Sequence, residues 1–110
     1  MKIQVESVND ITVVILEGEL NVDDSIKLRE AFLKILQQGA TEVMVDLEKV
    51  GFIGSAGLAV LIEMLQLLKR TGGKLGCCNI NDHIRGLFEI TKIHKLITIY
   101  EDRTRAVKSF

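Results

Sequence analysis

The sequence predicts an α/β protein in which a mixed central β-sheet is packed with helices, in the order β-β-α-β-α-β-α-β-α. This prediction rests on two kinds of segment that alternate along the chain. Short apolar segments typical of strands alternate with longer segments in which apolar residues recur with the spacing of one helix face. Strands separated by helices are expected to lie parallel with right-handed crossovers, whereas the first strand should lie antiparallel at one edge.

Composition narrows the possible partners and locations. The chain of 110 residues has a formal net charge of −1 and no basic block, which argues against nucleic acid as the main partner. The longest apolar region, residues 56–68, is too short to span a bilayer and contains Glu63 and Gln66. Residues 2–6 alternate like a strand, so we expect no signal peptide here. We therefore expect residues 1–110 to be a single soluble, cytoplasmic domain without membrane insertion.

The first part of the chain predicts a hairpin and then a helix. Apolar residues at positions 3 and 5 and at 11, 13 and 15 predict two strands joined around the turn pair Asn9-Asp10. The segment Gly18-Glu19-Leu20-Asn21 is expected to break the second strand, and Asp23 and Asp24 to cap and charge the start of a helix over residues 25–38. The core face of that helix is assigned to Ile26, Leu28, Ala31, Phe32, Ile35 and Leu36.

The second part begins with a nearly continuous apolar run at residues 43–47, which predicts a strand covered on both faces. A helix follows over residues 55–70. Its inner face is predicted to hold Gly57, Val60, Leu61, Met64, Leu65 and Leu68, and its outer face Ser55, Ala56, Ala59, Glu63, Gln66 and Arg70, with Leu58 and Ile62 on the border. Strands at 74–80 and 96–100, and helices opened by Asn81-Asp82 and by Asp102, complete the order.

Ser55 stands where the buried strand gives way to this helix. Backbone amides at a helix start are unpaired, and the helix dipole favours negative charge there. Two roles follow for the hydroxyl: an ordinary N-cap, or a modifiable group at the tip of a docking surface that can carry a phosphate.

Catalytic and metal-binding patterns are weak in this sequence. Residues 53–57 lack the first glycine of a nucleophile elbow, so an enzyme with Ser55 as nucleophile is the least supported alternative. His83 and His94 are expected at the surface or at helix ends. Cys77 and Cys78 are adjacent, without the spacer that metal and redox motifs use, and should point to opposite faces of a strand. We expect no enzyme activity, no cofactor and no metal.

Three segments carry a resemblance to a known family. They are LEGELN at residues 16–21, EVMVDL at 42–47 and, most specifically, VGFIGSAGLA at 50–59. The last is similar to the (F/Y)-(I/M)-D-S-(S/T/A)-G-L-G segment of STAS domains, in particular of bacterial anti-sigma factor antagonists, also called anti-anti-sigma factors. The resemblance extends over residues 2–107 and implies a STAS-like mixed sheet. This chain differs from the pattern at Gly54, where the family has Asp, at Ala59, where it has Gly, and at Asn21, where an acid is frequent.

The resemblance implies a function in transcription regulation. Proteins of this kind bind an anti-sigma factor that is also a serine kinase, which frees a sigma factor; phosphorylation switches the binding off, and a Ser/Thr phosphatase reverses it. By position, Ser55 is the implied phosphate acceptor, and the implied partner-binding residues are Asn21, Asp23, Gly54, Ser55, Ala56, Leu58, Ala59 and Ile62. Gly54 gives weight to an alternative, a STAS scaffold that is not phosphorylated, or an accessory subunit in a signalling or lipid-transport complex.

Overall fold

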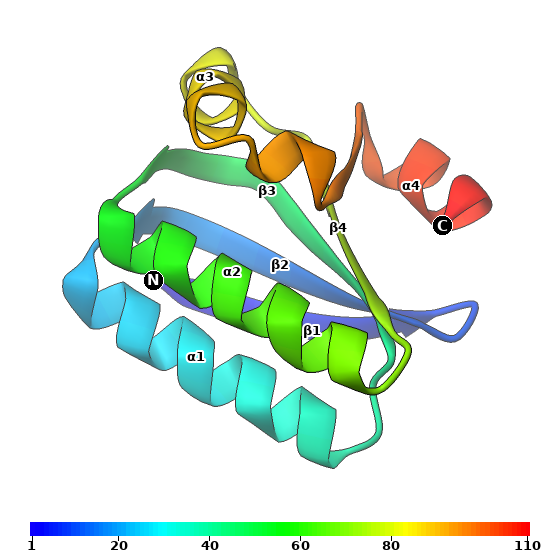
Figure 1. The fold of residues 1–110 in the computed structure, drawn as a ribbon. Helices are drawn as coiled ribbons and strands as arrows, with labels where there is room; N and C mark the ends of the chain where they lie inside the picture. Colours follow the sequence, from blue (N-terminus) through cyan, green and yellow to red (C-terminus); the bar gives the residue numbers. More distant parts are fainter.

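The computed structural model describes residues 1–110 and contains one five-stranded sheet with the strand order β1-β2-β3-β4-β5 (Figure 1). The strands are β1 (Lys2–Val8), β2 (Ile11–Leu20), β3 (Glu42–Ile53), β4 (Lys74–Cys78) and β5 (Thr98–Tyr100). β1 pairs with β2 in antiparallel orientation, and the three following pairs are parallel. The predicted mixed sheet with an antiparallel edge strand is confirmed.

The helices occur in the predicted order, with one short addition. They are α1 (Val22–Gln37), α2 (Ser55–Arg70), α3 (Asp82–Ile90), the 3-10 helix η1 (Ile93–Lys95) and α4 (Arg103–Ser109). In Figure 1, α1 and α2 lie side by side along one face of the sheet, and α4 lies apart from them at the C-terminus. No helix combines the length and apolar character needed to cross a membrane.

Two hydrophobic cores form because β2, β3 and β4 have apolar side chains on both faces. The larger core joins the sheet to α1, α2 and α3, and the smaller one contains Ala106 of α4. Cys77 belongs to the larger core and Cys78 to the smaller. Adjacent cysteines therefore point to opposite faces, as the sequence predicted.

The β1–β2 hairpin differs from the prediction at one end. The turn pair is confirmed, because Asn9 and Asp10 adopt positive φ angles of 51° and 66°. The second strand ends within the predicted segment 18–21, but only at Leu20, so Gly18 itself does not end it. Gly18 takes φ 126° between two register shifts against β3, so it bends the strand without breaking its pairing.

Helix α1 also differs from the prediction. It begins at Val22, and Asn21 is its N-cap in place of the two aspartates. Ser25 is buried and its hydroxyl donates to the Asn21 carbonyl at 2.5 Å, whereas Ile26 is 56% exposed. Ile26 stands two positions from Leu28, about 200° around the helix, so it cannot share the core stripe.

Strand lengths account for the remaining differences. β3 reaches from Glu42 to Ile53 and is longer than the apolar run suggested. β4 ends at Cys78, and β5 covers only Thr98–Tyr100, because Leu96 is the C-cap of η1 and Ile97 lies in the bend that follows it. None of these differences alters the predicted topology.

Candidate functional site

The site that the sequence predicted lies where β2 and β3 end next to each other. Leu20 and Ile53 are register partners, and the Gly54 amide donates a hydrogen bond to the Leu20 carbonyl at 2.9 Å. Because the two strands are parallel, α1 and α2 start at the same end of the sheet (Figure 1). The fold therefore brings the loop after residue 20 beside the loop after residue 53.

Asn21 and Asp23 provide the α1 side of this site. The Asn21 side chain accepts a hydrogen bond from the Asp24 amide at 2.9 Å, which satisfies one of the unpaired amides at the helix start. Asp23 is exposed and makes no ion pair, whereas Asp24 accepts from the amino group of Met1 at 3.1 Å. Asp23 thus remains a free negative charge at the helix start.

Gly54 and Ser55 provide the α2 side. The N-cap residue is Gly54 and not Ser55, which is the first residue inside the helix. No side chain caps this helix, and the Ser55 hydroxyl is exposed and makes no hydrogen bond within the chain. The capping role considered for Ser55 is therefore wrong, and its hydroxyl is free to react or to contact a partner.

Two glycines in this segment serve different purposes. Gly54 has φ −82° and ψ 175°, an extended conformation open to any residue, and an added Cβ would lie 3.2 Å from the Leu20 carbonyl oxygen. Gly57 is packed more tightly: an added Cβ would lie 2.9 Å from Cβ of Leu20 and 3.2 Å from Cγ2 of Ile53. Gly57 therefore allows α2 to approach the end of β2, and this close approach fixes the position of Ser55.

The faces of α2 agree with the winding predicted from the sequence. All six residues assigned to the inner face are buried. Of the residues proposed for partner binding, Ser55 and Ala59 are exposed, while Gly54, Ala56, Leu58 and Ile62 are partly exposed. Ile62 lies about two helical turns beyond Ser55 and is the last residue of the proposed partner-binding surface along α2.

An aromatic contact beside Ser55 could not be predicted from the sequence. The rings of Phe52 and His83 stack with centroids 5.6 Å apart and an interplanar angle of 21°. Asn81 holds the two segments together, since its side chain accepts from the Ile84 amide at 2.8 Å and donates to the Gly51 carbonyl at 3.1 Å. Both histidines are exposed as expected, and neither is hydrogen-bonded to Ser55.

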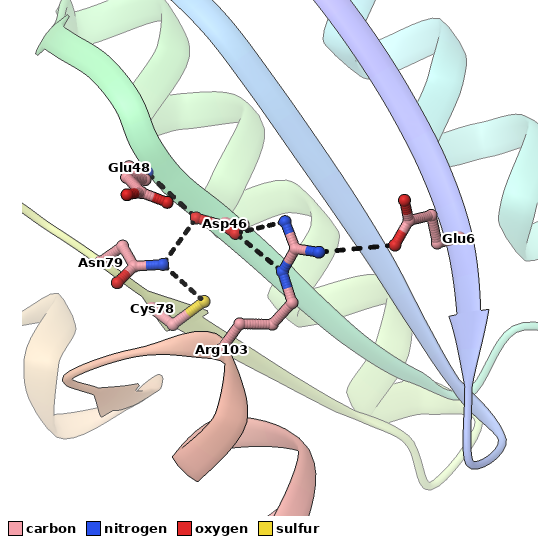
Figure 2. A network of polar contacts seen from close by, with 6 residues as sticks. All are labelled: Glu6, Asp46, Glu48, Cys78, Asn79 and Arg103. Carbon is pink, nitrogen blue, oxygen red and sulfur yellow. Dashed lines mark hydrogen bonds and ion pairs between the residues drawn. The ribbon is translucent and has the colours of Figure 1, made fainter.

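A second polar cluster lies elsewhere, around Asp46 of β3 (Figure 2). The buried Asp46 carboxylate accepts from Arg103 at 2.8 and 3.0 Å, from the Asn79 side chain at 3.0 Å and from the Glu48 amide at 3.1 Å. Arg103 also reaches Glu6 at 3.5 Å. Every buried polar side-chain atom in the protein has a hydrogen-bond partner, and the bonds from Arg103 to Asp46 attach α4 to the sheet.

Charge on Asp46 is stabilised although the group is buried. Burial opposes ionisation, but the hydrogen bonds from Asn79, the Glu48 amide and Arg103 together lower the pKa of Asp46 below its ordinary value. On the same face, burial and the nearby Asp46 raise the pKa of Cys78 to about 12. No group of three or more His, Cys, Asp and Glu side chains is arranged to hold a metal ion.

Comparisons with known proteins agree with the fold. The sequence profile of the STAS domain matches residues 2–106. The anti-sigma-B factor antagonist of Bacillus subtilis (strain 168) is 34% identical over 91 residues, covering 83% of this chain and 82% of the relative. The anti-sigma F factor antagonist of Paenibacillus polymyxa is 25% identical over 108 residues, covering 97% and 92%. Among solved structures, the phosphorylated form of the Bacillus cell fate determinant SpoIIAA superimposes with a TM-score of 0.78 at 21% identity, covering 97% of both chains.

Proposed function

Because the chain belongs to the STAS domain family, we propose that it is an anti-sigma factor antagonist, which binds an anti-sigma factor and thereby frees a sigma factor. The relatives from Bacillus and Paenibacillus carry this designation. In the proposed cycle the anti-sigma factor is a serine kinase, phosphate on Ser55 ends the binding, and a Ser/Thr phosphatase restores it. The chain acts as a binding protein in the cytoplasm and performs no catalysis.

One observation carries this proposal: the exposed, unbonded hydroxyl of Ser55 at the uncapped start of α2. The first-turn amides have no side-chain acceptor, and the first turn of α2 contains no acidic residue. A phosphate there would meet unpaired amides and the positive end of the helix dipole, without repulsion from its own helix.

Magnitudes explain why such a phosphate would switch binding and not unfold the domain. It adds about −1.5 to −2 charges at pH 7, and the helix end offsets it by about 0.3–2 kcal/mol. In a docked complex an unmatched charge costs several kcal/mol, and about 1.4 kcal/mol is a tenfold change in affinity. The interface cost is therefore the larger effect.

A phosphorylation assay tests the proposal. The chain is incubated with Mg-ATP and each purified anti-sigma factor kinase encoded in the same genome, and the phosphorylated residue is located by mass spectrometry. We expect phosphate on Ser55 and none on Ser55→Ala. Ser7→Ala is the matched control, because Ser7 is also exposed but lies on β1, and this variant should be modified like the parent.

A second candidate function rests on Gly54, which leaves Ser55 without the neighbouring carboxylate of the family pattern. A STAS scaffold or accessory subunit of a signalling or lipid-transport complex would bind its partner without being phosphorylated. Stable binding of an anti-sigma factor or another complex component, with Ser55 unmodified by every kinase tested, would favour this function.

A further inference from the structure

Large apolar side chains are exposed on both sides of Ser55. Val22 and Ile26, in the first two turns of α1, are 65% and 56% exposed, and Phe52, near the end of β3, is 43% exposed. Single exposed apolar residues are ordinary, but a cluster around a proposed functional residue is typical of an interaction surface.

An ion pair shows how the α1 residues lie relative to Ser55. Nε of Arg29 donates to Oε1 of Glu63 at 2.6 Å, which connects the outward faces of α1 and α2. The two helices follow parallel strands and run in the same direction. Ile26 and Val60 each lie three residues before the paired Arg29 and Glu63, so they stand at the same level along the two helices. Val22 and Ala56 each lie seven residues before the pair and are level for the same reason. Val22, Ile26 and Arg29 share one helix face, as do Ser55, Ala59 and Glu63, so the two outward stripes run beside each other.

On the other side of Ser55, the ring of Phe52 is held in place. A Cβ on Gly54 would lie 3.5 Å from Cε1 of this ring, so the ring covers the residue that precedes Ser55. His83 stacks against the same ring, and the Asn81 side chain, which donates to the Gly51 carbonyl, fixes the start of α3 against the end of β3. A ring fixed in advance loses little conformational entropy when a partner covers it.

We infer that Val22, Ile26 and Phe52 are the apolar anchors with which the chain holds the anti-sigma factor. Val22 and Ile26 lie on one side of Ser55, and Phe52, stacked against His83, lies on the other. This inference rests on the proposed function. The docking face of the anti-sigma factor should present apolar recesses for these side chains and a cationic group opposite Asp23, which is exposed and makes no ion pair. A phosphate on Ser55 would be desolvated between the two apolar flanks, which accounts for its effect on binding.

Matched substitutions test the inference. The affinity of the anti-sigma factor kinase that binds the parent chain is measured by calorimetry for Ile26→Gln and Phe52→Ala. Ile90→Gln is the control, because Ile90 is also an exposed helical isoleucine, 82% exposed, but belongs to α3. We expect both site variants to bind tenfold more weakly or worse, as interface anchors do, and the control to bind within twofold of the parent.

Each outcome is decisive once melting temperatures confirm that the variants are folded; Phe52→Leu replaces Phe52→Ala if the latter is not. If Ser55→Asp loses binding while Ile26→Gln and Phe52→Ala bind like the parent, the inference is overturned and the proposed function stands. If no kinase binds the parent, the proposed function fails and the inference with it. If Ile26→Gln converts a dimeric parent to a monomer without weakening kinase binding, a second copy of the chain occupies the surface and the inference is overturned.

Discussion

Gly54 and Ser55 show how one residue type alters the chemistry of its neighbour. The backbone at Gly54 is extended and does not require glycine. A Cβ at this position would lie 3.5 Å from Cε1 of Phe52, an ordinary contact, and more tightly, at 3.2 Å, from the Leu20 carbonyl oxygen. What glycine provides is a helix start without a carboxylate. An aspartate there would cap α2 and place a negative charge beside the Ser55 oxygen. The departure from the family pattern therefore changes the electrostatics around Ser55 and leaves the backbone unchanged.

The two cysteines give a prediction at the same scale. Burial raises the pKa of the Cys77 thiol, and that of Cys78 to about 12, so almost no thiolate exists at neutral pH. We expect neither thiol to react with Ellman's reagent at pH 8 in the folded protein, and both to react after unfolding in guanidinium. Fast reaction of either thiol in the folded protein would contradict the observed burial.

At the scale of the element, α2 depends on its close contact with the end of β2. Gly57 allows this contact, since a Cβ at this position would lie 2.9 Å from Cβ of Leu20 and would force one of the two elements to shift. The same contact sets the depth at which Ser55 stands above the sheet. The packing of Gly57 and the position of Ser55 are thus coupled in a single turn of helix.

Gly57→Ala tests this coupling. The added methyl group would lie 2.9 Å from Cβ of Leu20, which cannot move without its strand, so we expect a loss of about 1–3 kcal/mol in unfolding free energy. Gly86→Ala is the matched control, because Gly86 is also helical and has nothing within 4 Å of the added atom. That control should gain about 0.4–1 kcal/mol. Urea unfolding measures both changes, and equal stability of the two variants would contradict the packing of α2.

Comparison of the predicted helices and strands with the observed ones shows which features of the fold could be predicted from the sequence. The inner face of α2 and the order of strands and helices follow from apolar spacing, which is local information. The assignment of Ile26 to the core face is wrong, because an isoleucine beside a core stripe has the same apolar character as the residues of the stripe. The turn residues at 18–21 predict that the strand ends there but not that Leu20 is its last residue. The contact between Phe52 and His83 joins β3 to α3, and no local pattern encodes a contact between elements 31 positions apart.

For the whole molecule, the Asp46 cluster connects the first and last parts of the fold. Arg103 at the start of α4 binds a carboxylate of the central strand β3 and reaches Glu6 of β1 (Figure 2). The cluster is separate from the start of α2. Modification of Ser55 is therefore expected to leave it, and the rest of the scaffold, unchanged.

Asp46 makes the stability of the fold depend on pH. Burial opposes its charge, but its hydrogen-bond donors lower its folded-state pKa below the usual 3.8. A group with a lowered folded-state pKa stabilises the protein above its unfolded-state pKa, and this stabilisation is lost as the pH falls through the folded-state value. We expect the melting temperature of the parent to exceed that of Asp46→Asn most at pH 6, and the difference to shrink below pH 3.8. A difference that stays constant from pH 6 to pH 2.5 would contradict the role of this carboxylate.

The most direct test is a calorimetric titration of the anti-sigma factor kinase with the unmodified chain and with the chain phosphorylated on Ser55. We predict that phosphorylation weakens binding by tenfold or more while the melting temperature changes by only a few degrees, because the added charge acts at the interface and not in the fold. Equal affinity of the two forms would contradict the proposal that Ser55 controls docking.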